Sequence, residues 1–464
     1  MDARDLAAAT LVRVWTEDAF AAPVLTATLR RHPQLDERDA RLATELVFGV
    51  LRTEAALERR IDRHASSPRY KGQPWVFAHL LIAAYCLAFL DRIPAHAAVE
   101  TAVGAIKRRE GPRVAGFANA VLRRLGEASG GDEPDTASAR RAAAARQNLP
   151  RWLRRRLRET LGERGLDALL HVDARRTGPP PLDLCLAAGE DRDAWLSRLR
   201  EASRGRWSKG RWSPRCLRGW GVGPSDRLPG AGAAWRVQEQ GAQVLADLVG
   251  ATAGNLVLDA CAGRGGKTWW LLEAVGARGA VDAADLHPRK LERLRERVDL
   301  PLRHAFGVDW TRGPGDVPAD HYDVVLVDAP CTGVGTLARR PEIARRLRRG
   351  DPARLADVQV AIARTAATRL RPGGRLVYAV CSVLPEEGRD VALRLAREPD
   401  LEPASFPEGA ARSLAASLRA AAAPPSHPGD QADGAAAIGL TLSPSAHDTD
   451  GYFITCFRRR LGAR

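Results

Sequence analysis

Two cysteines stand where they could take part in covalent chemistry. Cys331 comes just after the apolar run YDVVLVD, and Cys381 comes directly after the apolar run GRLVYAV. Alone, each is more often a buried structural thiol than a nucleophile. Together, at the same edge of the predicted sheet, they favour covalent catalysis. Pro330 fixes the backbone before the first cysteine, and Gly333 and Gly335 leave space for a flat substrate.

A glycine-rich segment earlier in the chain has the composition of a nucleotide-binding turn. It reads DACAGRGGKT at residues 259–268, and its glycines allow the backbone to pass close to a ligand. A dinucleotide fingerprint is excluded, because Thr268 stands at the place of its third glycine. A phosphate-binding P-loop is nearly matched by the final GKT, although Cys261 replaces its first glycine.

An S-adenosylmethionine site is the third interpretation, and charge favours it. Such a site has an acid at the end of the first strand, a glycine-rich turn, and an acid at the end of the second strand that binds the ribose hydroxyls. Asp259 and Asp285 stand at those two places, and Asp309, after the third strand, could reach the adenine. Acids suit a sulfonium cation better than a triphosphate. A turn that only packs a helix on a strand is the alternative without a ligand.

These residues need a sheet that brings them to one edge. From residue 236 onward the chain alternates apolar strand-like runs with amphipathic helical runs, which predicts a parallel sheet with crossover helices. In such a sheet, ligands bind beyond the carboxyl ends of the strands. The expected strands cover residues 255–260, 280–284, 302–308, 322–328 and 374–380, the expected helices cover residues 267–274, 288–298 and 354–370, and residues 439–442 and 452–457 are expected to pair as an antiparallel hairpin at the sheet edge.

The preceding part of the chain predicts two further domains. Residues 2–125 are helical throughout and indicate a bundle, and the uncharged run at residues 74–90 is expected to be its central helix rather than a membrane span. Residues 126–138 have the composition of a linker. The expected domains are an all-α bundle at residues 1–128, a small basic α/β module at residues 140–235 and an α/β sheet domain at residues 236–464.

Length and composition agree with this division. The chain has 464 residues, which suggests three domains at about 150 residues each, and its formal charge of +15 favours a polyanionic partner. Apolar residues make up 45% and charged residues 27%, which excludes a mainly disordered chain and a polytopic membrane protein. Seven scattered cysteines, without a C-x-x-C pair or a histidine cluster, predict no disulfide framework and no metal site, so the expected compartment is the cytoplasm. Nothing in the sequence points beyond a monomer.

Two basic stretches could bind RNA. Residues 140–158 are rich in arginine and contain no acid, and residues 203–220 interleave basic residues with tryptophans. Basic side chains bind phosphates, and indoles stack on unpaired bases. The alternatives are a solvated helix face for the first stretch and a hairpin with inward tryptophans for the second. The candidate RNA-binding residues are Arg52, Arg123, Arg154, Arg155, Trp207, Arg211 and Trp212.

At its motifs the sequence resembles the Sun/RsmB-type RNA cytosine methyltransferases, which make 5-methylcytosine in small-subunit (16S) ribosomal RNA. The family patterns D-x-C-A-A-P-G-G-K-T, D-A-P-C-S-G-x-G and L-V-Y-x-T-C-S are largely matched at residues 259–268, 328–335 and 376–382. The N-terminal part is similar to the NusB-like RNA-binding helical domain, on the sequences RDAR, ELVFGVLR and NAVLR at residues 38–41, 45–52 and 119–123. The resemblance implies a class I, Rossmann-like seven-stranded methyltransferase that follows a NusB-like bundle and a small α/β linker module, and that uses S-adenosyl-L-methionine on ribosomal RNA.

The resemblance also implies a role for individual residues. Cys381 is the expected nucleophile on carbon 6 of a cytosine, and Cys331 assists its elimination afterwards. Asp328 holds the exocyclic amine and the ring nitrogen, and Lys267 contacts the base carbonyl. The base must be unpaired or flipped to be reached. The expected cofactor-binding residues are Asp259, Cys261, Ala262, Gly263, Gly265, Gly266, Lys267, Asp285, Asp309 and Asp328.

The sequence departs from the family patterns at a few positions. Gly263 and Arg264 replace Ala-Pro in the glycine loop, Thr332 replaces Ser, Val380 replaces Thr, Gly388 replaces Asn, and Ala242 replaces Ser in the segment that leads into the sheet domain. None of these changes removes a side chain with an implied catalytic role. The changes can still alter the local geometry, so a catalytically inactive RNA-binding or ribosome-assembly relative is kept as an alternative. A P-loop-type nucleotide-binding protein is a further alternative.

Overall fold

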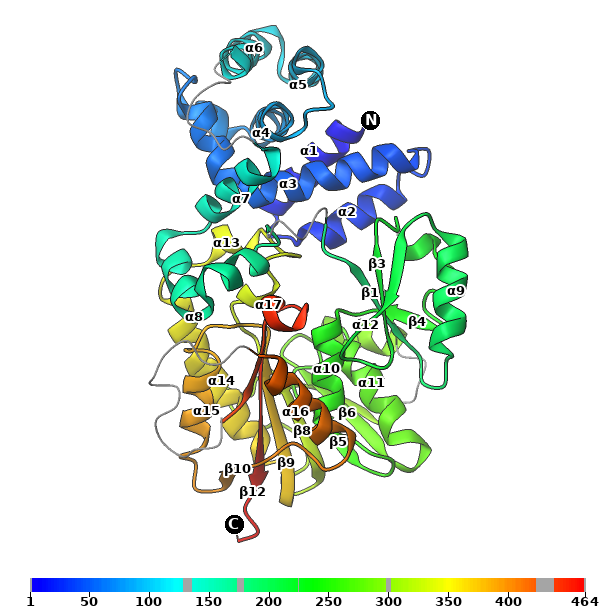
Figure 1. Ribbon diagram of the computed structural model, residues 1–464. Helices are drawn as coiled ribbons and strands as arrows, with labels where there is room; N and C mark the ends of the chain where they lie inside the picture. Colours follow the sequence, from blue (N-terminus) through cyan, green and yellow to red (C-terminus); the bar gives the residue numbers. More distant parts are fainter. Residues whose placement is uncertain are drawn as a thin grey trace. The chain divides into compact units, whose positions relative to one another are not determined.

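The computed structural model describes residues 2–127, 136–172, 179–223, 225–297, 302–422 and 438–462 (Figure 1). The chain divides into two compact units. The first comprises Met1–Arg158, Leu166–Pro180 and Leu337–Leu347, and the second comprises Glu159–Gly165, Pro181–Thr336 and Arg348–Arg464. This division differs from the three expected ranges. The small module is not a separate unit, residues 159–165 belong to the second unit although the chain on both sides belongs to the first, and Leu337–Leu347 belongs to the first unit although the chain on both sides belongs to the second.

The first unit is a helical bundle around a central apolar helix. Its helices are α1 (Ala3–Thr16), α2 (Ala21–Arg30), α3 (Glu37–Asp62), η1 (Pro68–Gly72), α4 (Pro74–Phe89), α5 (Ala95–Glu110), α6 (Pro112–Glu127), α7 (Ala137–Asn148), most of α8 (Arg151–Leu169) and α13 (Ile343–Arg346). The uncharged α4 is buried on nearly all sides and packs against α1, α3, α5, α6 and α7. This central place confirms the expectation for residues 74–90. No helix in the described part of the chain combines the length and the apolar character needed to cross a membrane.

Helix α7 is fixed to the bundle by polar contacts. The side-chain oxygen of Asn148 accepts a hydrogen bond from the Ala55 amide of α3 at 2.9 Å. Arg146 forms a two-pronged ion pair with Asp167, with both nitrogen–oxygen distances at 2.7 Å. The arginine-rich stretch at residues 140–158 therefore packs with the bundle, whereas the sequence analysis places it in the small module.

A segment that follows the first cysteine motif also belongs to the bundle. Within Leu337–Leu347, the Glu342 carboxylate accepts a hydrogen bond from the Ala21 amide at 3.0 Å. Arg346 donates to the Ala19 carbonyl at 2.7 Å. The chain that leaves the motif at residues 328–335 is thus anchored in the first unit.

The second unit contains a small antiparallel sheet in the order β2-β3-β1-β4. Its elements are β1 (Leu182–Leu186), α9 (Arg192–Ala202), β2 (Arg206–Lys209), β3 (Cys216–Trp220) and β4 (Trp235–Val237). Trp195, Trp207 and Trp235 form the centre of its apolar core. A β-carbon on Gly219 would lie 2.8 Å from the ring of Trp207, so the glycine makes space for this indole.

The large sheet of the second unit runs in the order β10-β12-β9-β8-β5-β6-β7. Strands β9, β8, β5, β6 and β7 are parallel neighbours, and β12 is antiparallel to both β9 and β10. The strands are β5 (Leu256–Asp259), β6 (Ala280–Asp285), β7 (His304–Gly307), β8 (Tyr322–Asp328), β9 (Leu370–Val380), β10 (Leu401–Pro403), β11 (Leu440–Leu442) and β12 (Tyr452–Arg459). β11 pairs with β12 as expected, but β12 lies inside the sheet rather than at its edge. The edge position belongs to β10, which is too short to give a periodic sequence pattern.

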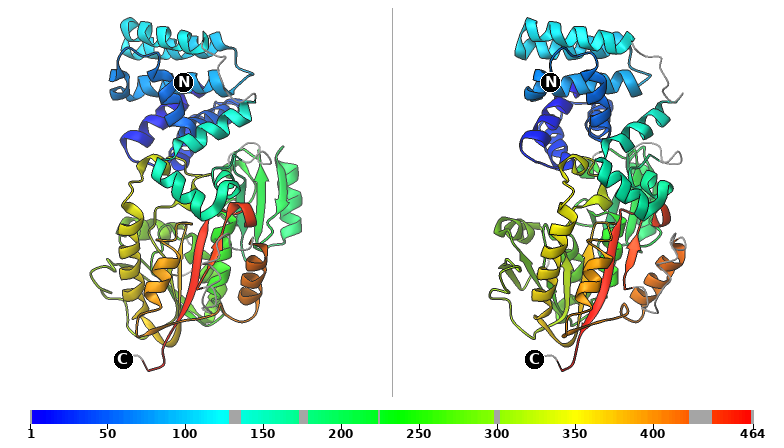
Figure 2. Two further views of the ribbon diagram at one scale, coloured as in Figure 1. Left: turned by 60° about the vertical axis from the view of Figure 1, so that its left-hand side comes forward. Right: turned by 90° about the vertical axis from the view of Figure 1, so that its left-hand side faces the viewer.

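Helices cover both faces of the large sheet (Figure 2). One apolar core joins it to α10 (Gln240–Val249), α11 (Gly266–Val275), α12 (Pro288–Arg297) and α16 (Ala410–Ala421), and a second joins it to α14 (Asp351–Ala367) and α15 (Arg389–Leu395). Residues that alternate along each strand supply the two cores, and α14 and α16 lie on opposite sides of the sheet. The expected Rossmann-like architecture is confirmed.

Candidate active site

The two cysteines that the sequence singles out meet in the structure. β8 and β9 are parallel neighbours, with Asp328 opposite Ala379, so the loops after them leave the sheet at the same edge. The Sγ atoms of Cys331 and Cys381 lie 3.4 Å apart, within hydrogen-bond distance. This hydrogen bond and burial raise the pKa of Cys331 well above its usual value. Cys331 therefore stays a thiol that can donate to its neighbour.

Backbone hydrogen bonds hold the cysteine loops against a third turn. The Gly335 amide donates to the Cys381 carbonyl at 3.0 Å, and the Gly451 amide donates to the Gly335 carbonyl at 2.8 Å. A β-carbon on Gly335 would overlap the backbone of Gly451. Glycine at residue 335 is therefore required for the close approach of these loops.

Lys267 and Asp328 form a close ion pair at the same edge of the sheet. Lys267 lies in the first turn of α11, Asp328 ends β8, and the Nζ to Oδ2 distance is 2.5 Å. Burial acts against the charged amine, but Asp328, together with the nearby Asp259 and Cys381, outweighs it, so the pKa of Lys267 is raised. The pair presents one cationic donor and one anionic acceptor in fixed positions.

The glycine loop after β5 is tied to the end of β6. The Asp285 carboxylate accepts hydrogen bonds from the Gly263 amide at 3.1 Å and from the His287 amide at 2.8 Å. Gly263 and Gly265 have φ angles of 57° and 83°, which residues with a side chain disfavour. The turn leaves backbone amides and one acid at the carboxyl edge, which is the arrangement that a nucleoside cofactor needs.

Asp259, at the end of β5, fits the cationic part of a cofactor. One of its oxygens accepts a hydrogen bond from the Thr268 hydroxyl at 2.7 Å, and the other has no hydrogen-bond partner among the described residues. Burial raises the pKa of Asp259 to about 6. A buried carboxylate with one unsatisfied oxygen is stabilised by a cation placed against it.

The other predicted cofactor residues have less distinct settings. Asp309 follows β7, and its carboxylate accepts hydrogen bonds from the Thr311 amide and hydroxyl at 3.1 and 2.6 Å. The Ala262 amide donates to the Ala284 carbonyl at 2.9 Å. Burial raises the pKa of Cys261 well above its usual value, so this thiol is unreactive. No cluster of histidine, cysteine and acidic side chains within the described ranges could hold a metal ion.

Four of the predicted RNA-binding residues have accessible side chains. Arg123 on α6, Arg155 on α8 and Arg211 before β3 are exposed, and Arg154 is half-buried. The guanidinium of Arg211 lies 4.4 Å from the ring centre of Trp212. These arginines can reach a phosphate in solvent.

The other three predicted RNA-binding residues are occupied inside the protein. Trp207 is 2% exposed and Trp212 is 8% exposed, and the indole of Trp212 donates to the His447 carbonyl at 2.7 Å. Arg52 donates to the Ala338 carbonyl at 2.7 Å. The structure therefore favours the inward-packing alternative for the two tryptophans and a structural role for this arginine.

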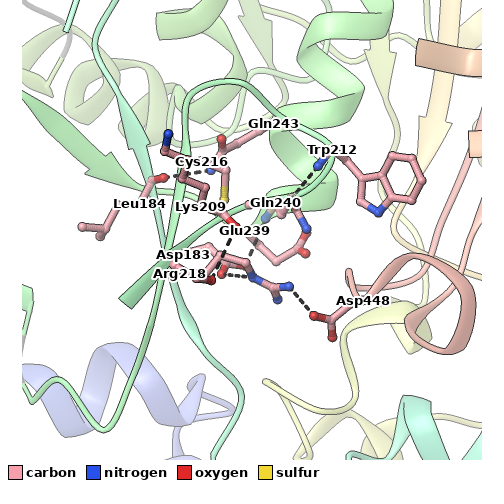
Figure 3. Close-up of polar contacts among 12 residues, drawn as sticks. Asp183, Leu184, Lys209, Trp212, Cys216, Arg218, Glu239, Gln240, Gln243 and Asp448 are labelled. Carbon is pink, nitrogen blue, oxygen red and sulfur yellow. Dashed lines mark hydrogen bonds and ion pairs between the residues drawn. The ribbon is translucent and has the colours of Figure 1, made fainter. Parts of the chain in front are cut away.

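A buried ion pair joins the small sheet to the turn before β12 (Figure 3). Arg218 donates to Asp183 at 2.9 Å and to Asp448 at 2.5 Å, and the Gln240 amide donates to the second Asp183 oxygen at 3.2 Å. Asp183 and Arg218 are both buried. Because Asp448 lies close to Gly451 in the same turn, the small sheet supports the backbone that contacts the first cysteine loop.

The structure adds one residue that the sequence analysis missed. Glu387, in the loop after β9, is fully buried and accepts hydrogen bonds from Thr332 and Ser382, each of which follows one of the two cysteines. No local signal separates it from its charged neighbours Glu386, Arg389 and Asp390.

The departures from the family patterns are compatible with this geometry. Thr332 uses its hydroxyl as a hydrogen-bond donor, which a serine would also do. A β-carbon on Gly388 would lie 2.8 Å from the ring of Phe453, so a small residue belongs there. Glu239 caps α10 by accepting a hydrogen bond from the Ala242 amide, which an alanine supplies as well as a serine, and Arg264 is exposed.

The fold and the site together define a class of protein. A parallel sheet with an antiparallel β12 beside β9, a glycine loop after β5 and acids at the ends of β5 and β6 characterise a class I, Rossmann-like methyltransferase.

Comparison with known proteins gives the family. Residues 247–458 match the family described as 16S rRNA methyltransferase RsmB/F, and residues 1–127 match the NusB family. Ribosomal RNA small subunit methyltransferase B of Klebsiella pneumoniae is 33% identical over 378 residues, which cover 80% of this chain and 84% of that protein. A probable ribosomal RNA small subunit methyltransferase B of Bacillus subtilis is 28% identical over 409 residues, with 86% and 89% covered. The crystal structure of PH0851 has the same fold, with a TM-score of 0.79 at 20% identity over 99% of both chains. The chain belongs to the RsmB/F family of ribosomal RNA small subunit methyltransferases.

Proposed function

We propose that this chain is an S-adenosylmethionine-dependent RNA (cytosine-5)-methyltransferase that acts on small-subunit ribosomal RNA as a cytoplasmic monomer. The observation that carries the proposal is the 3.4 Å separation of the Cys331 and Cys381 sulfurs at the carboxyl edge of a methyltransferase sheet. A nucleophilic thiol with a second thiol beside it suits a reaction that activates a base covalently and then releases it. The names of the relatives support the substrate class.

The residues at the glycine loop would hold the cofactor. S-adenosylmethionine supplies an electrophilic methyl group on a positively charged sulfur. Asp285 and the turn at residues 263–266 would bind its adenosine part, with Asp309 on the next strand end. The unpaired oxygen of Asp259 would face the cationic part.

The two cysteines would act on the base in sequence. The Cys381 thiolate adds to carbon 6 of cytosine, and the C5=C6 electron pair moves toward carbon 5, which then bonds the methyl group. In the release step the C5–H electron pair re-forms the C5=C6 bond and the S–C6 bond breaks. Cys331 gives its S–H proton to the departing Cys381 sulfur and takes the carbon-5 proton in exchange, so both cysteines end as thiols.

The ion pair beside the cysteines would orient the base. The Asp328 carboxylate accepts from the exocyclic amine, and Lys267 donates to the base carbonyl. The target must leave any duplex to reach them, and phosphate contacts would come from Arg123, Arg154, Arg155 and Arg211.

The test is methyl transfer from tritiated S-adenosylmethionine to transcribed small-subunit ribosomal RNA. The wild type is expected to label carbon 5 of cytosine, Cys381→Ala to lose transfer, and Cys331→Ala to accumulate an RNA adduct that survives denaturation. Full transfer by Cys381→Ala would disprove the nucleophile assignment. RNA binding without transfer would favour the inactive relative, and tight ATP binding without S-adenosylmethionine binding would favour the P-loop alternative.

A further inference from the structure

We propose that Glu387 is a positioning residue that holds the loops of Cys331 and Cys381 in register for catalysis, an inference that rests on the proposed function. Glu387 lies between β9 and α15, and its side chain is inaccessible to solvent. Its carboxylate contacts the residue that follows each cysteine, so one buried group joins the two loops.

The contact with the first loop is made through Thr332. The Thr332 amide donates to one Glu387 oxygen at 2.8 Å, and the Thr332 hydroxyl donates to the other at 2.5 Å. Two hydrogen bonds from one residue fix both its backbone and its side chain. The peptide that joins Cys331 to Thr332 is thereby oriented by Glu387.

The contact with the second loop is made through Ser382. The Ser382 hydroxyl donates to the Glu387 oxygen that also accepts from the Thr332 hydroxyl, at 2.7 Å. The Ser382 oxygen in turn accepts from the Leu384 amide at 3.2 Å. The hydroxyls of Thr332 and Ser382 therefore converge on a single carboxylate oxygen.

Gln359 of α14 closes this network from the helix side. Its side-chain nitrogen donates to Glu387 at 3.1 Å and to the Pro330 carbonyl at 3.0 Å. The Tyr378 hydroxyl of β9 donates to the Glu387 carbonyl at 2.5 Å. The residues on both sides of Cys331 are thus bonded to the network.

Charge gives Glu387 a second effect on the site. Burial raises the pKa of Glu387, while hydrogen bonds from Thr332 and Ser382 oppose that rise. A carboxylate there also raises the pKa of Cys331, which favours the thiol form of that cysteine. Glu387→Gln keeps the shape and one acceptor oxygen, which can still accept from the Thr332 amide and Gln359, but it removes the charge. Its amide nitrogen cannot accept from the Thr332 and Ser382 hydroxyls, which would have to rotate. Glu387→Ala removes the shape, the charge and all of these hydrogen bonds.

Single-turnover methyl transfer separates a positioning role from a purely structural one. Glu387→Ala is expected to lower the rate about 100-fold at a temperature where the protein is fully folded, with unchanged affinity for S-adenosylmethionine. Glu387→Gln is expected to recover part of the rate, because it keeps the acceptor for the Thr332 amide. The control is Glu398→Gln, since Glu398 pairs with Arg364 away from the cysteine loops. A wild-type rate in folded Glu387→Ala would overturn the proposal.

Oxidation provides a readout that needs no RNA. Diamide takes two electrons and two protons from a pair of thiols to form a disulfide, and peptide mass spectrometry measures the link between Cys331 and Cys381. Wild type and Glu398→Gln are expected to cross-link rapidly, and Glu387→Ala about tenfold more slowly. If the wild type transfers no methyl group, the proposed function fails while this rate still tests the positioning. If Glu387→Ala cross-links at the wild-type rate, the positioning role of Glu387 is overturned.

Discussion

Asp259 accepts a hydrogen bond from the Thr268 hydroxyl at 2.7 Å through one oxygen, while its other oxygen has no partner among the residues that the structure describes. Burial raises the pKa of this carboxyl group to about 6. An unsatisfied carboxylate oxygen inside a protein costs free energy until a donor or a cation meets it. Asp259 therefore links the binding of a cationic cofactor to pH.

We predict that S-adenosylmethionine binds more weakly as the pH falls through 6. Because the folded-state pKa lies above the unfolded value near 3.8, the free protein holds a proton on Asp259 at pH 5 that a cation must displace. If only the ionised form binds, the affinity falls about tenfold between pH 7 and pH 5. Calorimetry over this range measures the change. Asp259→Asn should bind weakly without this pH dependence, and Asp309→Asn should retain it. An unchanged pH dependence in Asp259→Asn would contradict the assignment.

The buried ion pair of the small sheet predicts an asymmetric loss of stability. Arg218→Met leaves Asp183 buried without its cation and should lower the free energy of unfolding by about 3 kcal/mol. Asp448→Asn removes a carboxylate that is 53% exposed and should cost less than about 1 kcal/mol. Urea denaturation measures both, and adding Asp183→Asn to Arg218→Met should restore part of the loss. Equal losses in the two single variants would show that burial does not control the effect.

The close packing around Gly388 predicts that replacing this glycine with the asparagine of the family pattern destabilises the protein. A β-carbon there would lie 2.8 Å from the Phe453 ring, which packs in the core between the sheet and α14. Gly388→Asn should therefore destabilise the protein by about 1–3 kcal/mol, as overpacking does. Combining it with Phe453→Leu should recover stability, because the smaller side chain gives space. A thermal melt that is unchanged in Gly388→Asn would show that the ring moves at no cost.

The sequence could predict where Cys331 and Cys381 meet, because the strands before them are continuous apolar runs and parallel strands end at one edge. It could not predict the place of Trp207. Basic residues flank this tryptophan whether it stacks on RNA or packs inward, and only the pairing that sets it over Gly219 decides between the two.

Glu387 could not be predicted for a different reason. Its partners Thr332 and Gln359 are distant in the sequence, and each looks like an ordinary polar residue in its own segment. A polar network of this kind is defined only by tertiary structure. The position of the segment Leu337–Leu347 could not be predicted either, since nothing in its composition indicates that it packs with the helical unit.

The exposed arginines predict a change in the salt dependence of RNA binding. Arg123→Ala and Arg211→Ala should each reduce the slope of log affinity against log salt by about 1, because each guanidinium that neutralises a phosphate releases counterions. Filter binding of transcribed small-subunit ribosomal RNA at several salt concentrations measures the slope. Arg13→Ala is the control, since Arg13 is paired with Glu17. Trp207→Ala should lower stability by about 3 kcal/mol but leave the slope unchanged, because its indole lies in the core of the small sheet. If the slope is reduced in the Arg13→Ala control, or if it is unchanged in both Arg123→Ala and Arg211→Ala, the assignment of these arginines to the RNA-binding surface is wrong.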